Sequence, residues 1–94
     1  MGRAEAYVEN YLVSECERRG WLCYKFTSPS NAGVPDRCII GNGRVLFIET
    51  KHPGDKPRKL QVMTHKKMRA CGADVRVCDT RELVDAALAD MEGS

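Results

Sequence analysis

The sequence has no apolar run that approaches the length of a membrane span, and it shows no signal peptide. Ala6 stands where a myristoylation site requires Ser or Thr. Internal repeats, low-complexity tracts and linkers are also lacking. These absences exclude membrane-embedded, myristoylated and repeat proteins, and 94 residues suit one domain with one core. We therefore expect a single cytoplasmic domain that spans residues 1–94.

The cysteines lack the pattern of a disulfide framework or a metal knuckle. Their number is odd, no Cys-x-x-Cys occurs, and several alternate with polar residues in expected strands. This usage is typical of reduced thiols in a cytosolic protein. A zinc site built from His52, His65 and Cys71 lacks the usual ligand spacing. The five cysteines are Cys16, Cys23, Cys38, Cys71 and Cys78.

Acidic residues are scarce in one segment and basic residues in another, although the net charge is only +2. Between Lys51 and Arg69 there are seven Lys or Arg, and Asp55 is the only acid; residues 79–92 hold five acids against Arg81. The basic segment suits a polyanionic partner, and a solvated helix face is the alternative reading. The cations expected to contact nucleic acid are Lys56, Arg58, Lys59, Lys66 and Lys67.

Apolar spacing and turn residues predict the element order α-β-β-β-α-β-α. Helices are expected over residues 3–19, 58–71 and from 80 onward, and strands over residues 21–27, 37–40, 44–51 and 73–78. The four apolar residues at 45–48 predict a strand covered on both faces. An inner stripe of the second helix is expected at Leu60, Met63, Met68 and Cys71. The last helix, capped by Asp79 or Thr80, is expected to bury Leu83, Val84, Ala87, Leu88 and Met91.

The chemistry concentrates between Gly33 and Lys51. Asp36 opens one expected strand, and a Gly-Asn-Gly connection predicts a hairpin to the next. Glu49 and Lys51 are two residues apart on that second strand, so both side chains point to the same face. Depending on register, Asp36 approaches them. Two adjacent carboxylates repel each other unless a cation joins them, and Mg2+ commonly uses one or two carboxylates plus substrate phosphates.

Two acids of the first helix fall on its expected inner face. Glu5 and Glu9 continue the line of Leu12 and Cys16 at steps of three and four. A buried acid is costly unless something satisfies it. One alternative is that both lie near the helix N-terminus, where carboxylates are favourable. Beside the Asp36 and Glu49 pair, a role for one of them in the site is the preferred interpretation.

These residues resemble a known nuclease pattern. Pro35-Asp36, followed after one strand by Glu49-Thr50-Lys51, is similar to the motif of the PD-(D/E)xK superfamily. Gly-Val-Pro-Asp-Arg from Gly33, Val-Leu-Phe-Ile-Glu-Thr-Lys up to Lys51, and Leu60-Gln61 resemble its VRR-NUC branch, in particular the stand-alone phage-type members. The resemblance implies an α/β restriction-endonuclease-like core, with a mixed central sheet flanked by helices. It also implies a phage- or prophage-encoded protein that acts in the bacterial cytoplasm.

The resemblance implies a divalent metal site for Mg2+ or Mn2+. Asp36 and Glu49 would bind the metal, and the backbone carbonyl of Thr50 would be a further ligand. The helical glutamate of the family corresponds best to Glu9, with Glu5, one turn earlier, as the alternative.

The remaining implied roles concern the water and the substrate. Lys51 would orient or activate the attacking water, and Gln61 would contact Lys51 or that water. Stand-alone members resemble homodimeric enzymes that resolve four-way (Holliday) DNA junctions, so we expect a homodimer acting on branched double-stranded DNA. Cleavage of flaps or linear DNA on the same fold is one alternative, and a non-catalytic nucleic-acid-binding module is another.

Overall fold

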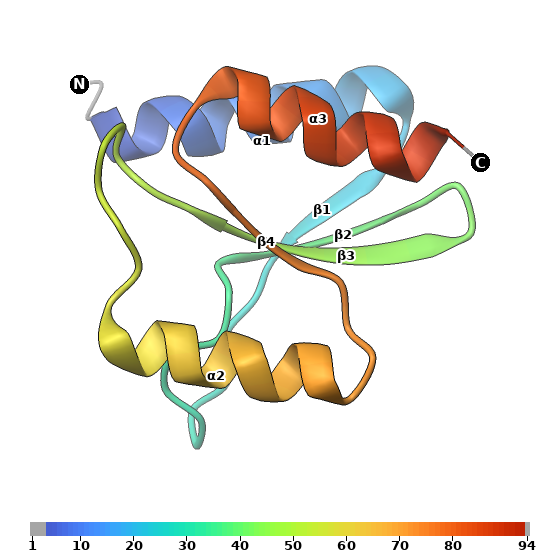
Figure 1. The fold of residues 1–94 in the computed structure, drawn as a ribbon. Coiled ribbons are helices and arrows are strands. Elements are labelled where there is room, and N and C mark those ends of the chain that lie inside the picture. Colours follow the sequence, from blue (N-terminus) through green and yellow to red (C-terminus); the bar gives the residue numbers. More distant parts are fainter. Residues whose placement is uncertain (1–3, 94) are drawn as a thin grey trace.

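A four-stranded sheet separates two layers of helices in the computed structural model (Figure 1). The structure describes the backbone of residues 4–93 and the side chains of residues 6–93. Helices α1 (Ala4–Arg19) and α3 (Arg81–Glu92) cover one face, and α2 (Lys59–Ala70) lies on the other. The strands are β1 (Leu22–Lys25), β2 (Arg37–Gly41), β3 (Arg44–Thr50) and β4 (Val75–Cys78). The predicted order and α/β class are confirmed, and no described helix is long and apolar enough to cross a membrane.

The sheet is mixed, with strand order β1-β2-β3-β4. β2 is antiparallel to β1 and β3, and β4 is parallel to β3. The predicted hairpin turns at Asn42 and Gly43, which both have positive φ (52° and 74°), as a two-residue hairpin of right-handed twist requires. This turn pairs Arg37 with Ile48. Asp36 therefore enters β2 beside Glu49, where β3 ends.

The core lies between the sheet and the α1–α3 layer. Val8, Leu12 and Cys16 of α1 are buried, and Glu9, predicted on the same face, is half-buried. Thr80 caps α3, and its hydroxyl accepts a 3.1 Å hydrogen bond from the Leu83 nitrogen. Leu83 was predicted to be buried but is 45% exposed, because it lies about 100° around the helix from buried Val84. The main core side chains are Val8, Leu12, Cys16, Ile39, Leu46, Ile48, Val84, Ala87, Leu88 and Met91.

The prediction that both faces of the apolar run in β3 are covered is wrong at the hairpin end. Leu46 and Ile48 are buried against the α1–α3 layer, whereas Val45 is 51% exposed on the opposite face. Figure 1 shows the reason, since the β2–β3 hairpin extends past the end of α2.

The predicted inner stripe of α2 is wrong at three of its four positions, and only Met68 is half-buried. Leu60 and Met63 are half exposed and Cys71 is exposed, while buried His65 and half-buried Gln61 and Thr64 face inward. Polar partners explain the inversion. The Thr64 hydroxyl donates to the Ala32 carbonyl at 2.8 Å, His65 hydrogen-bonds to the Gly33 backbone, and Gln61 reaches Glu49. Hydrogen bonds, more than apolar burial, therefore fix this helix.

Candidate active site

The strand ends form a cavity of about 260 Å3. Glu49 and Thr50 end β3, Lys51 follows directly, and Asp36 precedes β2. The predicted convergence of Asp36, Glu49 and Lys51 therefore occurs, at the carboxyl end of the β3–β4 pair. The residues lining the cavity are Glu9, Lys25, Asp36, Glu49, Thr50, Lys51 and Gln61.

Asp36 is fixed by Thr50. Its Oδ2 accepts one hydrogen bond from the Thr50 backbone nitrogen at 3.0 Å and another from the Thr50 hydroxyl at 2.8 Å. Sequence reasoning considered only the carbonyl of Thr50 and missed its side chain. Turn length and residue spacing do not reveal this contact, because it depends on the side-chain conformations of Asp36 and Thr50 as well as on strand register.

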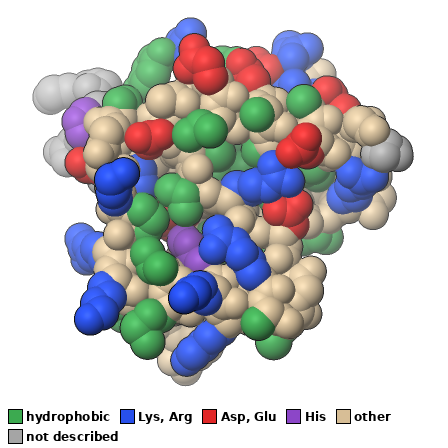
Figure 2. Space-filling model, viewed as in Figure 1, with side chains coloured by type: hydrophobic (Ala, Val, Ile, Leu, Met, Phe, Trp, Pro, Cys, Tyr) green, Lys and Arg blue, Asp and Glu red, His purple; other side chains and the backbone are tan. Residues whose placement is uncertain are grey.

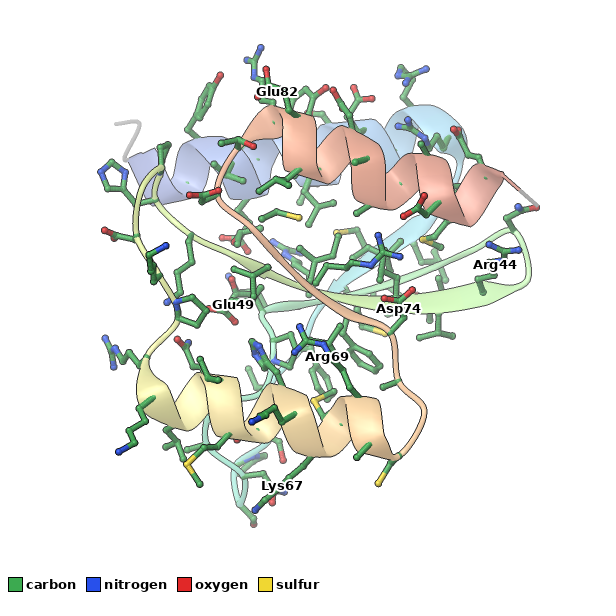
Figure 3. The ribbon with its side chains drawn as sticks, viewed as in Figure 1. Arg44, Glu49, Lys67, Arg69, Asp74 and Glu82 are labelled. Carbon is green, nitrogen blue, oxygen red and sulfur yellow. The ribbon has the colours of Figure 1, made fainter. Side chains whose placement is uncertain are left out.

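Glu49 is a buried carboxylate, only 2% exposed, which points toward α2 (Figure 3). Its Oε2 accepts a hydrogen bond from Gln61 Nε2 at 3.0 Å and lies 3.4 Å from Lys51 Nζ. Its Oε1 is buried without a hydrogen-bond partner among the described residues. Burial, together with the nearby Asp36 charge, raises the pKa of Glu49 to about 7, against the opposing effect of Lys51 and Gln61.

This arrangement fits a hard divalent cation. A buried, unpartnered carboxylate oxygen beside a second carboxylate is costly, and oxygen ligands of this kind are those Mg2+ and Mn2+ prefer. No group of three or more His, Cys, Asp or Glu side chains in the described part of the chain is placed to hold a metal ion. The donor set that fits is therefore Asp36 and Glu49, with backbone or solvent oxygens completing it.

Glu49→Gln is expected to raise the melting temperature of the metal-free protein at pH 8. The pKa of Glu49 is about 7 in the fold against an ordinary 4.5, so the folded chain binds the proton more tightly. Stability is then fully present below pH 4.5 and falls as the pH rises to 7. Glutamine keeps an oxygen for Gln61 and avoids this loss, which is about 1–3 kcal/mol.

Thermal unfolding followed by circular dichroism in chelator, at pH 5 and pH 8, measures this effect. The advantage of Glu49→Gln over wild type should shrink at pH 5. The exposed Glu82, on the far side of α3 (Figure 3), provides the matched control Glu82→Gln, which should show no such pH dependence. Equal melting temperatures of wild type and Glu49→Gln at pH 8 would contradict the assigned environment.

Glu9 reaches the same cavity from α1 but is held by two cations. Its Oε2 pairs with Arg37 Nε at 2.8 Å and with Lys25 Nζ at 3.1 Å. Burial alone would raise the pKa of Glu9, but the hydrogen bonds and charges of Arg37 and Lys25 outweigh it and lower the pKa. Sequence reasoning missed both cations, because they come from different strands. A metal-ligand role for Glu9 stays a prediction, and the side chain of Glu5 lies outside the described residues.

Gln61 was predicted to contact Lys51 or the attacking water; its amide donates to Glu49, and the contact with a water stays a prediction. Its Oε1 also accepts a 2.8 Å hydrogen bond from the Arg58 backbone nitrogen, so the amide is fixed at both ends. Gly33 (φ +88°) lets the loop between β1 and β2 lie directly on α2, since an added Cβ would come within 2.9 Å of the Leu60 carbonyl oxygen. The loop thereby packs against the turn of α2 that carries Gln61.

The predicted nucleic-acid-binding cations are all exposed. Figure 2 shows Lys and Arg side chains over α2, and acidic side chains mixed with further Lys and Arg over the α1–α3 layer. Figure 3 shows Lys67 pointing away from the sheet. The exposed cations of residues 56–67 therefore lie on and just before α2. The same helix reaches the cavity through Gln61.

Two carboxylates and a lysine at neighbouring strand ends, on a sheet of this topology, define a nuclease of the PD-(D/E)xK class. No family model matches the sequence. The chain is 42% identical over 80 residues to the protein named "Putative nuclease p44" of Acyrthosiphon pisum secondary endosymbiont phage 1, covering 84% of this chain and 86% of the relative. A solved structure of a VRR_NUC domain matches with a TM-score of 0.86 and 28% identity, covering 93% of this chain and 96% of that one. The chain belongs to the VRR-NUC family of nucleases.

Proposed function

We propose that this nuclease is a Mg2+- or Mn2+-dependent endodeoxyribonuclease that hydrolyses phosphodiester bonds in branched DNA and resolves four-way junctions as a homodimer. The observation that carries the proposal is the meeting of Asp36, Glu49 and Lys51 in one cavity, where Glu49 Oε1 is buried and unpartnered among the described residues.

Asp36, Glu49 and the Thr50 carbonyl would hold the cation. When bound, it supplies positive charge against the phosphodiester and Lewis acidity toward the oxygens involved in hydrolysis. The chain's own contribution is orientation. Thr50 fixes Asp36 through two hydrogen bonds, and Gln61 fixes Glu49 through one.

Lys51 would act on the water and the phosphoryl oxygens. Its side chain is 13% exposed, and Nζ lies 3.4 Å from Glu49 Oε2, at the wall of the cavity. An ammonium here can donate hydrogen bonds to an attacking water and stabilise negative charge that develops in the transition state. Both functions need a partly desolvated position, which the low exposure provides.

Branched DNA is supported by the kind of surface around the cavity. The exposed cations on and before α2 suit phosphate contacts, which position a nucleic acid without reading its sequence. Selection then falls to the shape of the DNA, such as a junction or a flap. The phage relative is also named a nuclease.

A homodimer is supported by an apolar row at the hairpin end of the sheet. Leu22 pairs with Ile40, and Ile40 pairs with Val45, so the three side chains share one face. They are 46%, 37% and 51% exposed. A two-fold dimer would present two identical cavities to two symmetric strands. Sedimentation velocity should give twice the chain mass of 10.5 kDa.

Cleavage of end-labelled DNA tests the proposal. A mobile four-way junction, a flap and a linear duplex are compared in Mn2+ and in chelator. We expect cleavage of the junction, in Mn2+ only. Preferential cutting of the flap or duplex would favour the alternative nuclease specificity. Binding without cleavage on every substrate would favour a non-catalytic module and contradict the proposal.

Neutralising Lys66 and Lys67 is expected to weaken DNA binding on all sequences. Each phosphate contact that is lost lowers the slope of log K against log salt by about 0.9, so the double variant Lys66→Gln/Lys67→Gln should lose up to about two units. Fluorescence anisotropy across a salt series measures the slope. Arg18→Gln/Arg81→Gln, on the α1–α3 layer, is the matched control. A slope equal to that of wild type would remove the α2 face from the interface.

A further inference from the structure

The solvent-facing side of α2 carries apolar side chains that lie outside the core. Leu60, Val62 and Met63 are 52%, 42% and 50% exposed, while Gln61, Thr64 and His65 face the protein. Single exposed apolar residues are ordinary, but Leu60 and Met63 are three residues apart and so share one side of α2. Val62 lies about 160° around the helix from Leu60, on another side. Leu60 and Met63 are therefore an exposed apolar pair outside the core.

This apolar turn adjoins the catalytic cavity. Gln61 lies in the same turn, and its amide donates to Glu49 Oε2 at 3.0 Å. Gln61 lines the cavity, whereas Leu60 and Met63 do not line it but belong to the same turn of α2. A substrate larger than the cavity would extend over this turn.

The positive charge around this turn favours a polyanionic partner. α2 contains Lys59, Lys66, Lys67 and Arg69 and no acid, and Arg58 caps its start. Figure 2 shows Lys and Arg side chains interspersed with apolar ones over α2. Arg69 itself donates to the Val75 carbonyl of β4. A second copy of the chain packed through this helix would set like charges against each other across the two-fold axis, which is unfavourable. Nucleic acid complements both the charge and the position.

We propose that Leu60 and Met63 form an apolar wedge that packs against unstacked bases at the branch point of the DNA, while the flanking cations bind its phosphates. The proposal rests on the proposed function. At a branch point the terminal base pairs of each arm expose a face, and inserted Leu or Met side chains cover such faces in kinked DNA. The wedge would give the enzyme a preference for branches over continuous duplex, which has no open base step.

The test places 2-aminopurine at the branch point of a four-way junction and measures its fluorescence in chelator, so that no cleavage intervenes. Wild type should increase the fluorescence at saturation by at least about twofold, because unstacking relieves quenching. Leu60→Ala/Met63→Ala should lose most of that increase yet keep its affinity for linear duplex, since the phosphate contacts remain. Met63→Gln alone serves as a second variant, should the double variant fold poorly.

Leu83→Ala is the matched control, because Leu83 is 45% exposed on α3, across the sheet from α2. It should behave as wild type. A fluorescence increase in Leu60→Ala/Met63→Ala and Met63→Gln equal to that of wild type would overturn the wedge. So would a change in the sedimentation of either variant without DNA, which would assign the surface to the dimer.

Different experimental results would overturn the wedge and the proposed function. Wild type that cleaves the junction in Mn2+ without any change in 2-aminopurine fluorescence overturns the wedge and leaves the nuclease. Wild type that unstacks the branch point in chelator but never cleaves in Mn2+ overturns the proposed function and supports the wedge.

Discussion

Asp36→Asn and Glu49→Gln should each reduce junction cleavage by at least about 100-fold, while DNA affinity in chelator stays near that of wild type. Loss of an outer-shell partner of a metal typically costs 10- to 100-fold, and loss of a ligand itself should cost no less. Each amide keeps one oxygen, so the Thr50 bonds to position 36 and the Gln61 bond to position 49 can persist. Single-turnover cleavage and anisotropy measure the two effects separately.

Glu82→Gln is the control, because it removes one carboxylate charge at an exposed position on α3. It should cut as wild type does. If either cavity variant also cuts at the wild-type rate, the assignment of the metal site is wrong. If a cavity variant loses DNA binding in chelator as well, the carboxylates act on folding or substrate contact rather than on the chemistry.

Lys51→Ala is expected to lower the cleavage rate about 10²- to 10⁴-fold, the usual range for a group that handles a proton or a developing charge. The variant leaves Asp36 and its Thr50 contacts untouched and removes one cation from beside Glu49. The variant should stay folded and bind Mn2+ close to wild type, although its metal-free melting temperature should fall at pH 8, where buried Glu49 loses its neighbouring cation. Lys51→Arg tests whether charge alone suffices, and it should stay well below wild type, because its planar fork cannot place one donor in the same position.

A wild-type rate for Lys51→Ala would remove the lysine from the chemistry. Loss of Mn2+ binding in this variant would instead make Lys51 a support for the metal site.

The meeting of Asp36, Glu49 and Lys51 could be predicted because the residues that determine it are close in the sequence. Asn42-Gly43 specifies a two-residue turn, and a turn of fixed length determines the register of both strands it joins. Counting back from the turn places Asp36 beside Glu49. The two-residue spacing of Glu49 and Lys51 then places both on one face.

The contacts that orient these residues could not be predicted, because they depend on tertiary placement. Arg37 and Lys25 pair with Glu9 only because β1, β2 and α1 meet at one corner. The inversion of α2 has the same origin. Apolar periodicity predicted that Leu60 and Met63 face inward, but polar groups beneath the helix hold Gln61 and its neighbours there instead.

Titration of Mn2+ into the purified protein without DNA tests the central claim most directly. The count of bound ions by electron paramagnetic resonance needs no substrate and no cleavage. We predict one specific Mn2+ per chain in wild type and in Glu82→Gln, with that site lost or at least about 100-fold weaker in Asp36→Asn and Glu49→Gln. Equal Mn2+ affinity in wild type and both cavity variants would show that these carboxylates do not hold the ion.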